Sequence, residues 1–247
     1  MPDDLLKTNE SYVLTVYKEN ITIVAKQWSG LIRALSTLAQ LIKPPKLVDL
    51  YYTMAYAPLE IADFPRYPYR GLMLDTARRY YSVDSILQIL DAMHIAKFNV
   101  FHWHLVEDES FPLELKTFQN VHKNAAFKQG ETYSQAMVRQ IVEHAQRLAI
   151  RVVPEFDNPG HSRAIGLDPY FTEIVRCFDK TNQYNLTNAY VIKGTPLSSP
   201  LDPSMDKTYE YIQGMLKDIQ GLFPDAHIHL GGDEIQQSCF DENPGIQ

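Results

Sequence analysis

The sequence has few cysteines, few tryptophans and no long apolar segment. Its 247 residues include two cysteines and two tryptophans. No apolar run approaches the ~20 residues that a transmembrane helix needs, and residues 1–7 lack the charged-then-apolar layout of a signal peptide. Positive charge is also in deficit, with a formal net charge of −7. This balance argues against nucleic acid or an anionic membrane surface as the main partner.

The remaining composition is that of an ordinary globular protein. Hydrophobic residues make up 45% and charged residues 21% of the chain, which is enough for one or two cores. Glycosylation sequons begin at Asn9, Asn20 and Asn185, and such triplets matter only in the secretory pathway. Spacing alone leaves open whether Cys177 and Cys239 form one disulfide or remain two buried thiols.

Residues 1–66 predict a small α+β domain that ends in a linker. Residues 11–17 and 20–25 are rich in β-branched and aromatic side chains, which is typical of a hairpin. Apolar residues then recur at helical spacing over 29–42, and Pro44-Pro45 ends that helix. A proline-rich stretch at 63–69 reads as the linker.

From residue 67 onward, short apolar strands alternate with helices. The expected strands are 71–76, 99–105, 151–156 and 227–230, and the expected helices are 83–96, 134–148 and 206–222. Apolar strands separated by helices indicate a parallel sheet covered on both faces. An open doubly wound sheet is the alternative. No glycine-rich phosphate fingerprint follows the first strand, which disfavours a nucleotide-binding version.

Polar side chains follow each expected strand directly. They are Asp75 and Arg78, then His102, His104, Glu107 and Asp108, then Asp157 and His161, and finally Asp233 and Glu234. In parallel α/β folds the carboxyl ends of the strands form the ligand-binding edge. The sequence therefore predicts that these side chains share one site.

Two chemistries fit these residue types. His102 and His104 lie on one face of a strand, and His161 with Asp233 could complete a site for metal-assisted hydrolysis. The alternative is glycosidic cleavage, in which a carboxylic acid protonates the leaving oxygen. The tandem Asp233-Glu234 favours the second chemistry, because neighbouring carboxylates resist ionising together and one of them keeps its proton.

Four motifs, taken together, resemble glycoside hydrolase family 20, and within it the animal and protist lysosomal hexosaminidases. They are RGLMLDTAR at 70–78, HWHL at 102–105, EFDNPGH at 155–161 and HLGGDE at 229–234. The resemblance runs from about Glu10 to the last residue. It implies a (β/α)8 TIM barrel. Because a closed barrel takes about 250 residues, we expect 67–247 to be its N-terminal half, with about four βα units, in a fragment of a longer enzyme.

The same resemblance implies an exo-acting β-N-acetylhexosaminidase that removes terminal β-linked N-acetylglucosamine or N-acetylgalactosamine from glycoconjugates. In that family the substrate's own acetamido group is the nucleophile and forms an oxazolinium intermediate, so configuration is retained. Glu234 would be the general acid and then the base, and Asp233 would orient the acetamido group. No metal or other cofactor is expected. The alternative is a non-catalytic carbohydrate-binding or interaction fragment.

Supporting roles also follow from the resemblance. Arg78 would hold sugar hydroxyls, and Asp157 with His161 would form a polar relay beside the acid. Glu107 stands where the family usually has Asp, and an added methylene there can displace a carboxylate by about an ångström. The resemblance further implies a Cys177–Cys239 disulfide, a lysosomal or secreted location, and a possible homo- or heterodimer in the full-length family.

Overall fold

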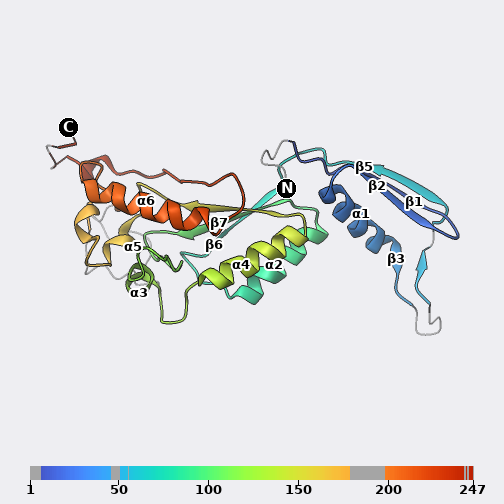
Figure 1. Cartoon of the computed structure of the whole chain (residues 1–247), viewed down its shortest axis with the longest axis horizontal. Helices are drawn as coiled ribbons and strands as arrows, with labels where there is room; N and C mark the ends of the chain where they lie inside the picture. Colours follow the sequence, from blue (N-terminus) through green and yellow to red (C-terminus); the bar gives the residue numbers. More distant parts are fainter. Residues whose placement is uncertain are drawn as a thin grey trace. The chain divides into compact units, whose positions relative to one another are not determined.

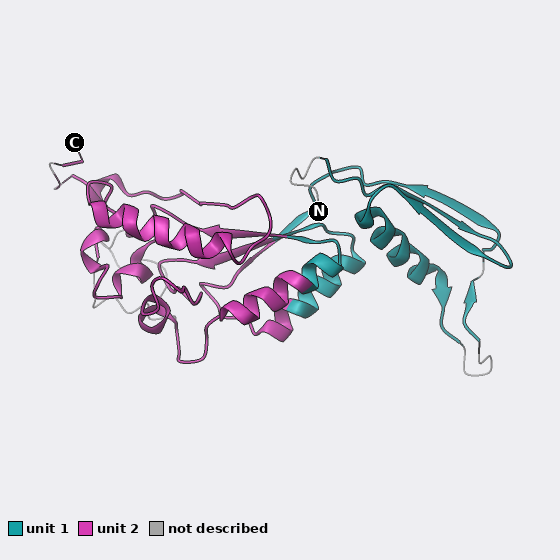
Figure 2. Cartoon of the chain, in the orientation of Figure 1, with its two compact units in different colours: residues 1–72, 87–101, 144–151 teal, residues 73–86, 102–143, 152–247 magenta. Residues whose placement is uncertain are grey.

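The computed structural model describes residues 7–45, 51–54, 56–178, 198–241, 243 and 245–246. The chain forms two compact units (Figure 2). The first comprises 1–72, 87–101 and 144–151, and the second comprises 73–86, 102–143 and 152–247. No helix in the described ranges is long and apolar enough to cross a membrane.

The first unit contains an antiparallel sheet with a helix packed against it. β1 (Tyr12–Val16) pairs with β2 (Ile21–Ala25) on one side and with β5 (Leu59–Asp63) on the other (Figure 1). α1 (Trp28–Leu41) contributes Ala34 to the core that the inward side chains of β1 form. The expected hairpin and helix are therefore confirmed. β5 was not expected, nor was the short hairpin of β3 (Ile42–Lys43) and β4 (Thr53–Met54).

The sequons differ in accessibility. Asn20 is exposed in the turn between β1 and β2. The Asn9 side chain is partly buried, and its Oδ1 accepts hydrogen bonds from the Ser11 N–H at 3.0 Å and the Ser11 hydroxyl at 2.5 Å. Asn185 lies outside the described residues. Asn20 is therefore the more accessible of the two described sequons.

A second sheet has the strand order β6-β7-β8 (Figure 1). Its strands are β6 (Gly71–Asp75), β7 (Val100–Val106) and β8 (Arg151–Phe156); α2 (Val83–Ile95) connects the first two, and α3 (Val121–Ala125) with α4 (Gln135–Arg147) connects the last two. Consecutive strands joined by helices are neighbours in the sheet, which is the pattern of βαβ units.

The fourth expected strand, 227–230, is wrong as a strand. After α5 (Arg163–Gly166) and α6 (Asp206–Gln220), the chain forms only one parallel bridge, between His229 and Glu155 of β8. Within the described ranges this segment pairs with β8 alone, and an isolated bridge does not define a strand. The apolar Ile228 and Leu230 remain exposed.

Aromatic packing fixes the central strand of this sheet in the second unit. Trp103 of β7 is fully buried, and its indole N–H donates to the Thr76 hydroxyl at 2.9 Å. Its ring meets Tyr133 and Phe223 edge-on, with centroids 5.2 and 6.3 Å away. Because side chains alternate along a strand, burying Trp103 directs its neighbours His102 and His104 to the opposite face.

Candidate active site

The polar residues that follow the strands form one connected network in the second unit. Glu107 lies at its centre. Oε1 of this buried carboxylate accepts a hydrogen bond from Arg78 at 2.6 Å and lies 3.3 Å from Nε2 of His104. Oε2 lies 2.8 Å from Nδ1 of His161. Glu107 therefore joins loops that follow different strands.

Burial by itself would raise the pKa of Glu107. Hydrogen bonds from His104 and His161, together with the positive charges of His161 and Arg78, outweigh this effect and lower the pKa to about 2. The carboxylate is thus ionised throughout the ordinary pH range. Its longer side chain, compared with Asp, reaches both the arginine and the histidine at once.

His161 connects this carboxylate to the acidic pair. Its Nδ1 faces Glu107, and its Nε2 lies 3.4 Å from Oε2 of Glu234 and 3.7 Å from Oδ2 of Asp233. The His161 side chain is 4% exposed, whereas those of Asp233 and Glu234 are 68% and 55% exposed. A buried imidazole therefore supports two accessible carboxyl groups.

The pKa of His161 is raised to about 9. Burial lowers it, but the hydrogen bond to Glu107 and the negative charges of Glu107 and Asp108 outweigh this effect. His104, between Glu107 and Glu155, has a pKa raised to about 10, because hydrogen bonds to both carboxylates and nearby negative charge outweigh burial. Both imidazoles are therefore protonated at neutral pH.

We expect stability to fall at alkaline pH for this reason. A histidine whose pKa is raised by folding stabilises the native state fully below its unfolded value of 6.5, and this contribution is lost as the pH rises through about 9. Urea unfolding between pH 6 and pH 10 should show the decline, with a shallower slope for His161→Gln. A flat profile in the parent chain would contradict the expectation.

Asp157 supports the acidic pair from the other side. Its Oδ1 accepts the Gly232 N–H at 2.8 Å, and its carboxyl shares a hydrogen bond with Asp233. Burial and the charge of Asp233 together raise the pKa of Asp157 to about 7. Two adjacent carboxyls that share one proton behave in this way. Asp157 therefore holds a proton below about pH 7.

The backbone that carries Asp233 and Glu234 is held tightly. Glu234 has a φ of 51°, and its carbonyl accepts a hydrogen bond from the buried Ser198 hydroxyl at 2.7 Å. A Cβ on Gly160 would meet the Asp233 carbonyl oxygen at 2.5 Å, so only glycine permits this approach. Sequence reasoning did not identify Ser198, since no motif relates it to the acidic pair.

A disulfide between Cys177 and Cys239 closes the loop that follows β8 onto the segment just beyond Glu234. The expected bridge is confirmed. Its Cα atoms are 5.5 Å apart, within the normal range. The bridge restricts the segment that leads away from the acidic pair.

Arg78 pairs with carboxylates and keeps an accessible side chain. Its guanidinium donates to Asp75 at 2.8 Å and to Glu107 at 2.6 Å, and it lies 3.5 Å from Glu109. Burial would lower the pKa of Arg78, but these carboxylates raise it. The side chain is nevertheless 47% exposed, so its remaining donors are accessible to a ligand.

The four residues of the alternative metal site do not come together. His102 and His104 both contact Glu155, at 2.5 and 2.9 Å, whereas His161 lies beside Asp233. In the part of the chain that the structure describes, no group of possible ligands contains all four. A hydrolytic metal site of that composition is therefore excluded.

Comparison with known proteins agrees with this network. The family model "Glycosyl hydrolase family 20, catalytic domain" matches residues 67–247. Beta-hexosaminidase subunit beta of Mus musculus is 37% identical over 98% of this chain and 42% of its own length. Beta-hexosaminidase subunit alpha of Bos taurus is 37% identical over 96% of this chain and 42% of its own length.

Two solved structures also superpose on this chain. The chitobiase of Flavobacterium johnsoniae superposes with a TM-score of 0.80 and 36% identity, covering 98% of this chain and 34% of that one. The beta-N-acetylhexosaminidase of Bacteroides fragilis has a TM-score of 0.79 and 30% identity, with coverages of 98% and 46%.

The chain belongs to glycoside hydrolase family 20. The expected fold class is thereby confirmed: the β6-β7-β8 sheet and its helices are part of a (β/α)8 barrel. The chain spans about 42% of the length of the curated relatives it matches.

Proposed function

We propose that the whole protein is an exo-β-N-acetylhexosaminidase, and that this chain carries its general acid and the groups that support it. The observation that carries the proposal is the accessible Asp233-Glu234 pair, with His161 3.4 Å from Glu234 and anchored by Glu107. Substrates would be glycans that end in β-linked N-acetylglucosamine or N-acetylgalactosamine. A domain boundary at residues 66–67 agrees with the start of the family match.

Glu234 would act in both steps of the reaction. First, the acetamido oxygen of the substrate attacks the anomeric carbon, the glycosidic bond breaks, and the proton of Glu234 passes to the leaving oxygen. Next, Glu234 takes a proton from the water that opens the oxazolinium ring. His161, 3.4 Å from the Glu234 carboxyl group, would hold that group in position through both steps.

Asp233 would stabilise the charge that develops on the acetamido group. Its carboxylate accepts a hydrogen bond from the acetamido N–H, so the group is oriented for attack and its positive charge is balanced. The proton held by Asp157 would let it donate a hydrogen bond to Asp233 and so direct the Asp233 side chain. Arg78 would hold hydroxyls of the same sugar through its exposed donors.

Asp233→Asn should lower kcat of the whole enzyme by about 100-fold, the typical effect of losing one charge-stabilising group. The amide cannot balance positive charge, while its similar shape keeps the fold. Steady-state kinetics with a chromogenic N-acetylglucosaminide would measure the loss. Asp241→Asn, at an exposed aspartate beyond the acidic pair, is the matched control; an unchanged kcat in Asp233→Asn would contradict the role.

The direct test of the proposal is turnover of that substrate by the whole enzyme and by residues 1–247. We expect hydrolysis by the whole enzyme and little or none by the isolated chain, because we propose that turnover needs the remainder of the barrel. A whole protein that does not cleave N-acetylhexosaminides would overturn the proposal.

A second candidate, a carbohydrate-binding fragment without turnover, is favoured by the exposure of the acidic pair in a chain that spans 42% of its relatives' length. Isothermal titration with a thiazoline analogue of the oxazolinium intermediate separates the two. This candidate would be favoured if residues 1–247 bound the analogue while neither this chain nor the whole protein hydrolysed the chromogenic substrate.

We also propose a lysosomal or secreted location and a homo- or heterodimeric whole enzyme. The Cys177–Cys239 disulfide and the exposed sequon at Asn20 support passage through an oxidising secretory compartment. The matched relatives are named as subunits alpha and beta, which supports assembly.

A further inference from the structure

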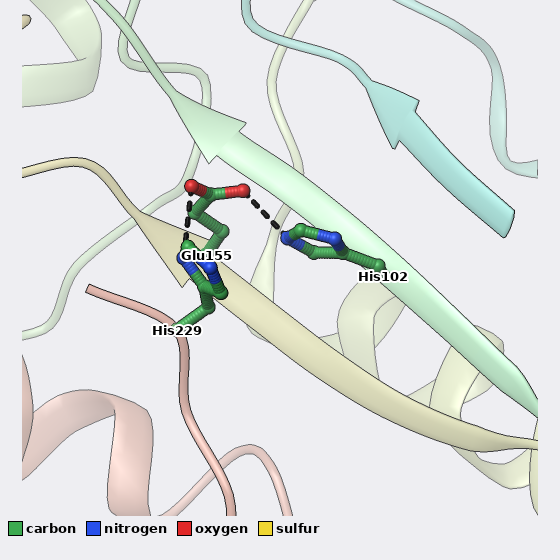
Figure 3. A group of neighbouring side chains, drawn as sticks. All are labelled: His102, Glu155 and His229. Carbon is green, nitrogen blue, oxygen red and sulfur yellow. Dashed lines mark hydrogen bonds and ion pairs between the residues drawn. The ribbon is translucent and has the colours of Figure 1, made fainter. Parts of the chain in front are cut away.

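A second cluster of metal-binding residue types adjoins the catalytic network at His104. It consists of His102 on β7, Glu155 on β8 and His229 in the bridge to β8 (Figure 3). One ligand atom of each lies within 4.8 Å of the others. We propose that these three residues bind one divalent transition-metal ion. The proposed site is separate from the glycosidase reaction and does not depend on it.

The ligand types suit such an ion. Two imidazoles and one carboxylate form the protein ligand set of many zinc sites and of non-haem iron sites. Magnesium and calcium prefer oxygen ligands and are disfavoured by the two imidazoles. We therefore take Zn²⁺ as the probe.

The ligand atoms of the three side chains already lie near the spacing that one bound ion requires. Nε2 of His102 is 2.5 Å from Oε2 of Glu155, and Nδ1 of His229 is 2.9 Å from Oε1 of the same carboxylate. Around a tetrahedral ion with bonds of ~2.1 Å, adjacent ligand atoms are about 3.4 Å apart, so both contacts would have to lengthen by about 0.5–0.9 Å. Figure 3 shows both rings turned toward the carboxylate. The centroids of the two rings are 5.0 Å apart. Small side-chain rotations would open the centre.

The backbone holds the three residues in place. His229 donates its N–H to the Pro154 carbonyl at 2.9 Å, and its own carbonyl accepts the Phe156 N–H at 3.0 Å. These two bonds fix His229 beside Glu155. His102 lies on β7, the central strand of the sheet. Glu155 and His102 lie on strands, which position ligands more rigidly than loops do, and the two backbone bonds hold His229 beside them.

At one contact of this cluster, a nitrogen and an oxygen that both carry lone pairs face each other without a hydrogen between them. Nδ1 of His229 accepts the Gly231 N–H at 3.0 Å, so this nitrogen carries a lone pair, yet Oε1 of Glu155 lies 2.9 Å away. Two electron-rich atoms therefore face each other, and a bound cation would relieve their repulsion. The ion would replace the Gly231 N–H at Nδ1.

The cluster is also open to solvent on one side. The His229 side chain is 51% exposed and that of His102 is 21% exposed, whereas Glu155 is buried at 8%. In residues 1–247, an added ion can thus reach the cluster from the histidine side. His104 completes the surroundings: its Nδ1 lies 2.9 Å from Oε2 of Glu155, and it acts as a hydrogen-bond donor instead of a ligand.

The test is zinc binding to chelator-treated residues 1–247 at pH 7.5, measured by isothermal titration and elemental analysis. We expect one Zn²⁺ per chain and a thermal midpoint that rises with zinc concentration. His102→Ala, His229→Ala and Glu155→Gln should each weaken binding by at least about tenfold. Cobalt substitution should add visible absorption bands that disappear in the same variants.

His144→Ala is the matched control, because it removes another imidazole that bonds a carboxylate, Asp91, at 2.7 Å. This variant should bind zinc as the parent does. Circular dichroism and the zinc-free thermal midpoint identify variants that have lost the fold, and Glu155→Gln, which keeps the side-chain shape, remains informative if a histidine variant unfolds. Absence of stoichiometric binding, or unchanged binding in a folded Glu155→Gln chain, would overturn the proposal.

Discussion

Glu234→Gln in the whole enzyme is expected to reduce kcat for unactivated N-acetylhexosaminides by about 1,000-fold. General acid catalysis contributes about 10²–10⁴-fold, and glutamine has no proton to give the leaving oxygen. KM should change little, because Glu234 interacts with the leaving oxygen mainly in the transition state. The measurement is steady-state hydrolysis of a natural-type disaccharide.

Substrate choice supplies an internal control for this prediction. A nitrophenyl leaving group needs less protonation than a sugar hydroxyl, so Glu234→Gln should lose less activity on the nitrophenyl substrate. Glu60→Gln, at an exposed residue of β5, should keep the parent kcat on both. If Glu234→Gln hydrolysed the disaccharide at the parent rate, the general acid would have to be another residue.

Of the substitutions proposed for the site, replacement of Glu107 should cause the largest decrease in the free energy of unfolding. Glu107→Ala would leave Arg78, His104 and His161 without the carboxylate that all three contact. Arg78 would keep Asp75 at 2.8 Å and His104 would keep Glu155 at 2.9 Å, so the main cost falls on the buried His161, which loses its nearest carboxylate. Removing one partner of a buried ion pair typically costs about 3–5 kcal/mol. Urea unfolding at pH 7 would measure the change in the free energy of unfolding.

A charge-removing variant of the same size refines this test. Glu107→Gln should lose less stability than Glu107→Ala, since its amide oxygen still accepts one hydrogen bond. Glu131→Gln, whose partner Lys128 is 79% exposed, should stay within about 0.5 kcal/mol of the parent. A Glu107→Ala chain as stable as the parent would show that the surrounding cations do not need this carboxylate.

The role of Glu107 also has a pH signature. Folding lowers its pKa from 4.5 to about 2, so its ionised form stabilises the native state above pH 4.5. That contribution is lost as the pH falls from 4.5 through 2. The network should therefore tolerate acidic conditions in which an ordinary glutamate is already half protonated.

Strong local periodicity explains which elements the sequence predicts well. The apolar spacing of 29–42 and the β-branched residues of 11–25 identify α1 and the β1–β2 hairpin, because each element carries its own pattern. β5 contains one β-branched residue, Ile61, and precedes a proline-rich linker, so its partner β1 decides its conformation. Tertiary pairing of this kind leaves little trace in a local window.

The candidate site likewise contains residues that the sequence identifies and residues that only the folded structure reveals. Glu234, Asp233 and His161 belong to motifs with distinctive spacing, so the sequence identifies them. Ser198 reaches the Glu234 carbonyl only through the folded backbone. Glu155 gathers three imidazoles from two other segments, and nothing in the order of residues along the chain reveals this number of partners.

The close backbone approach at Gly160 has a consequence for changing the enzyme by directed evolution. Any side chain there would push against the Asp233 carbonyl, so a saturation library at this codon would return the starting residue almost alone. Gly130, at φ +89° with open space around its Cβ position, would tolerate asparagine. Variants with new substrate preferences must therefore come from substitutions among the residues around the sugar, because the backbone that carries Asp233 does not tolerate a side chain at Gly160.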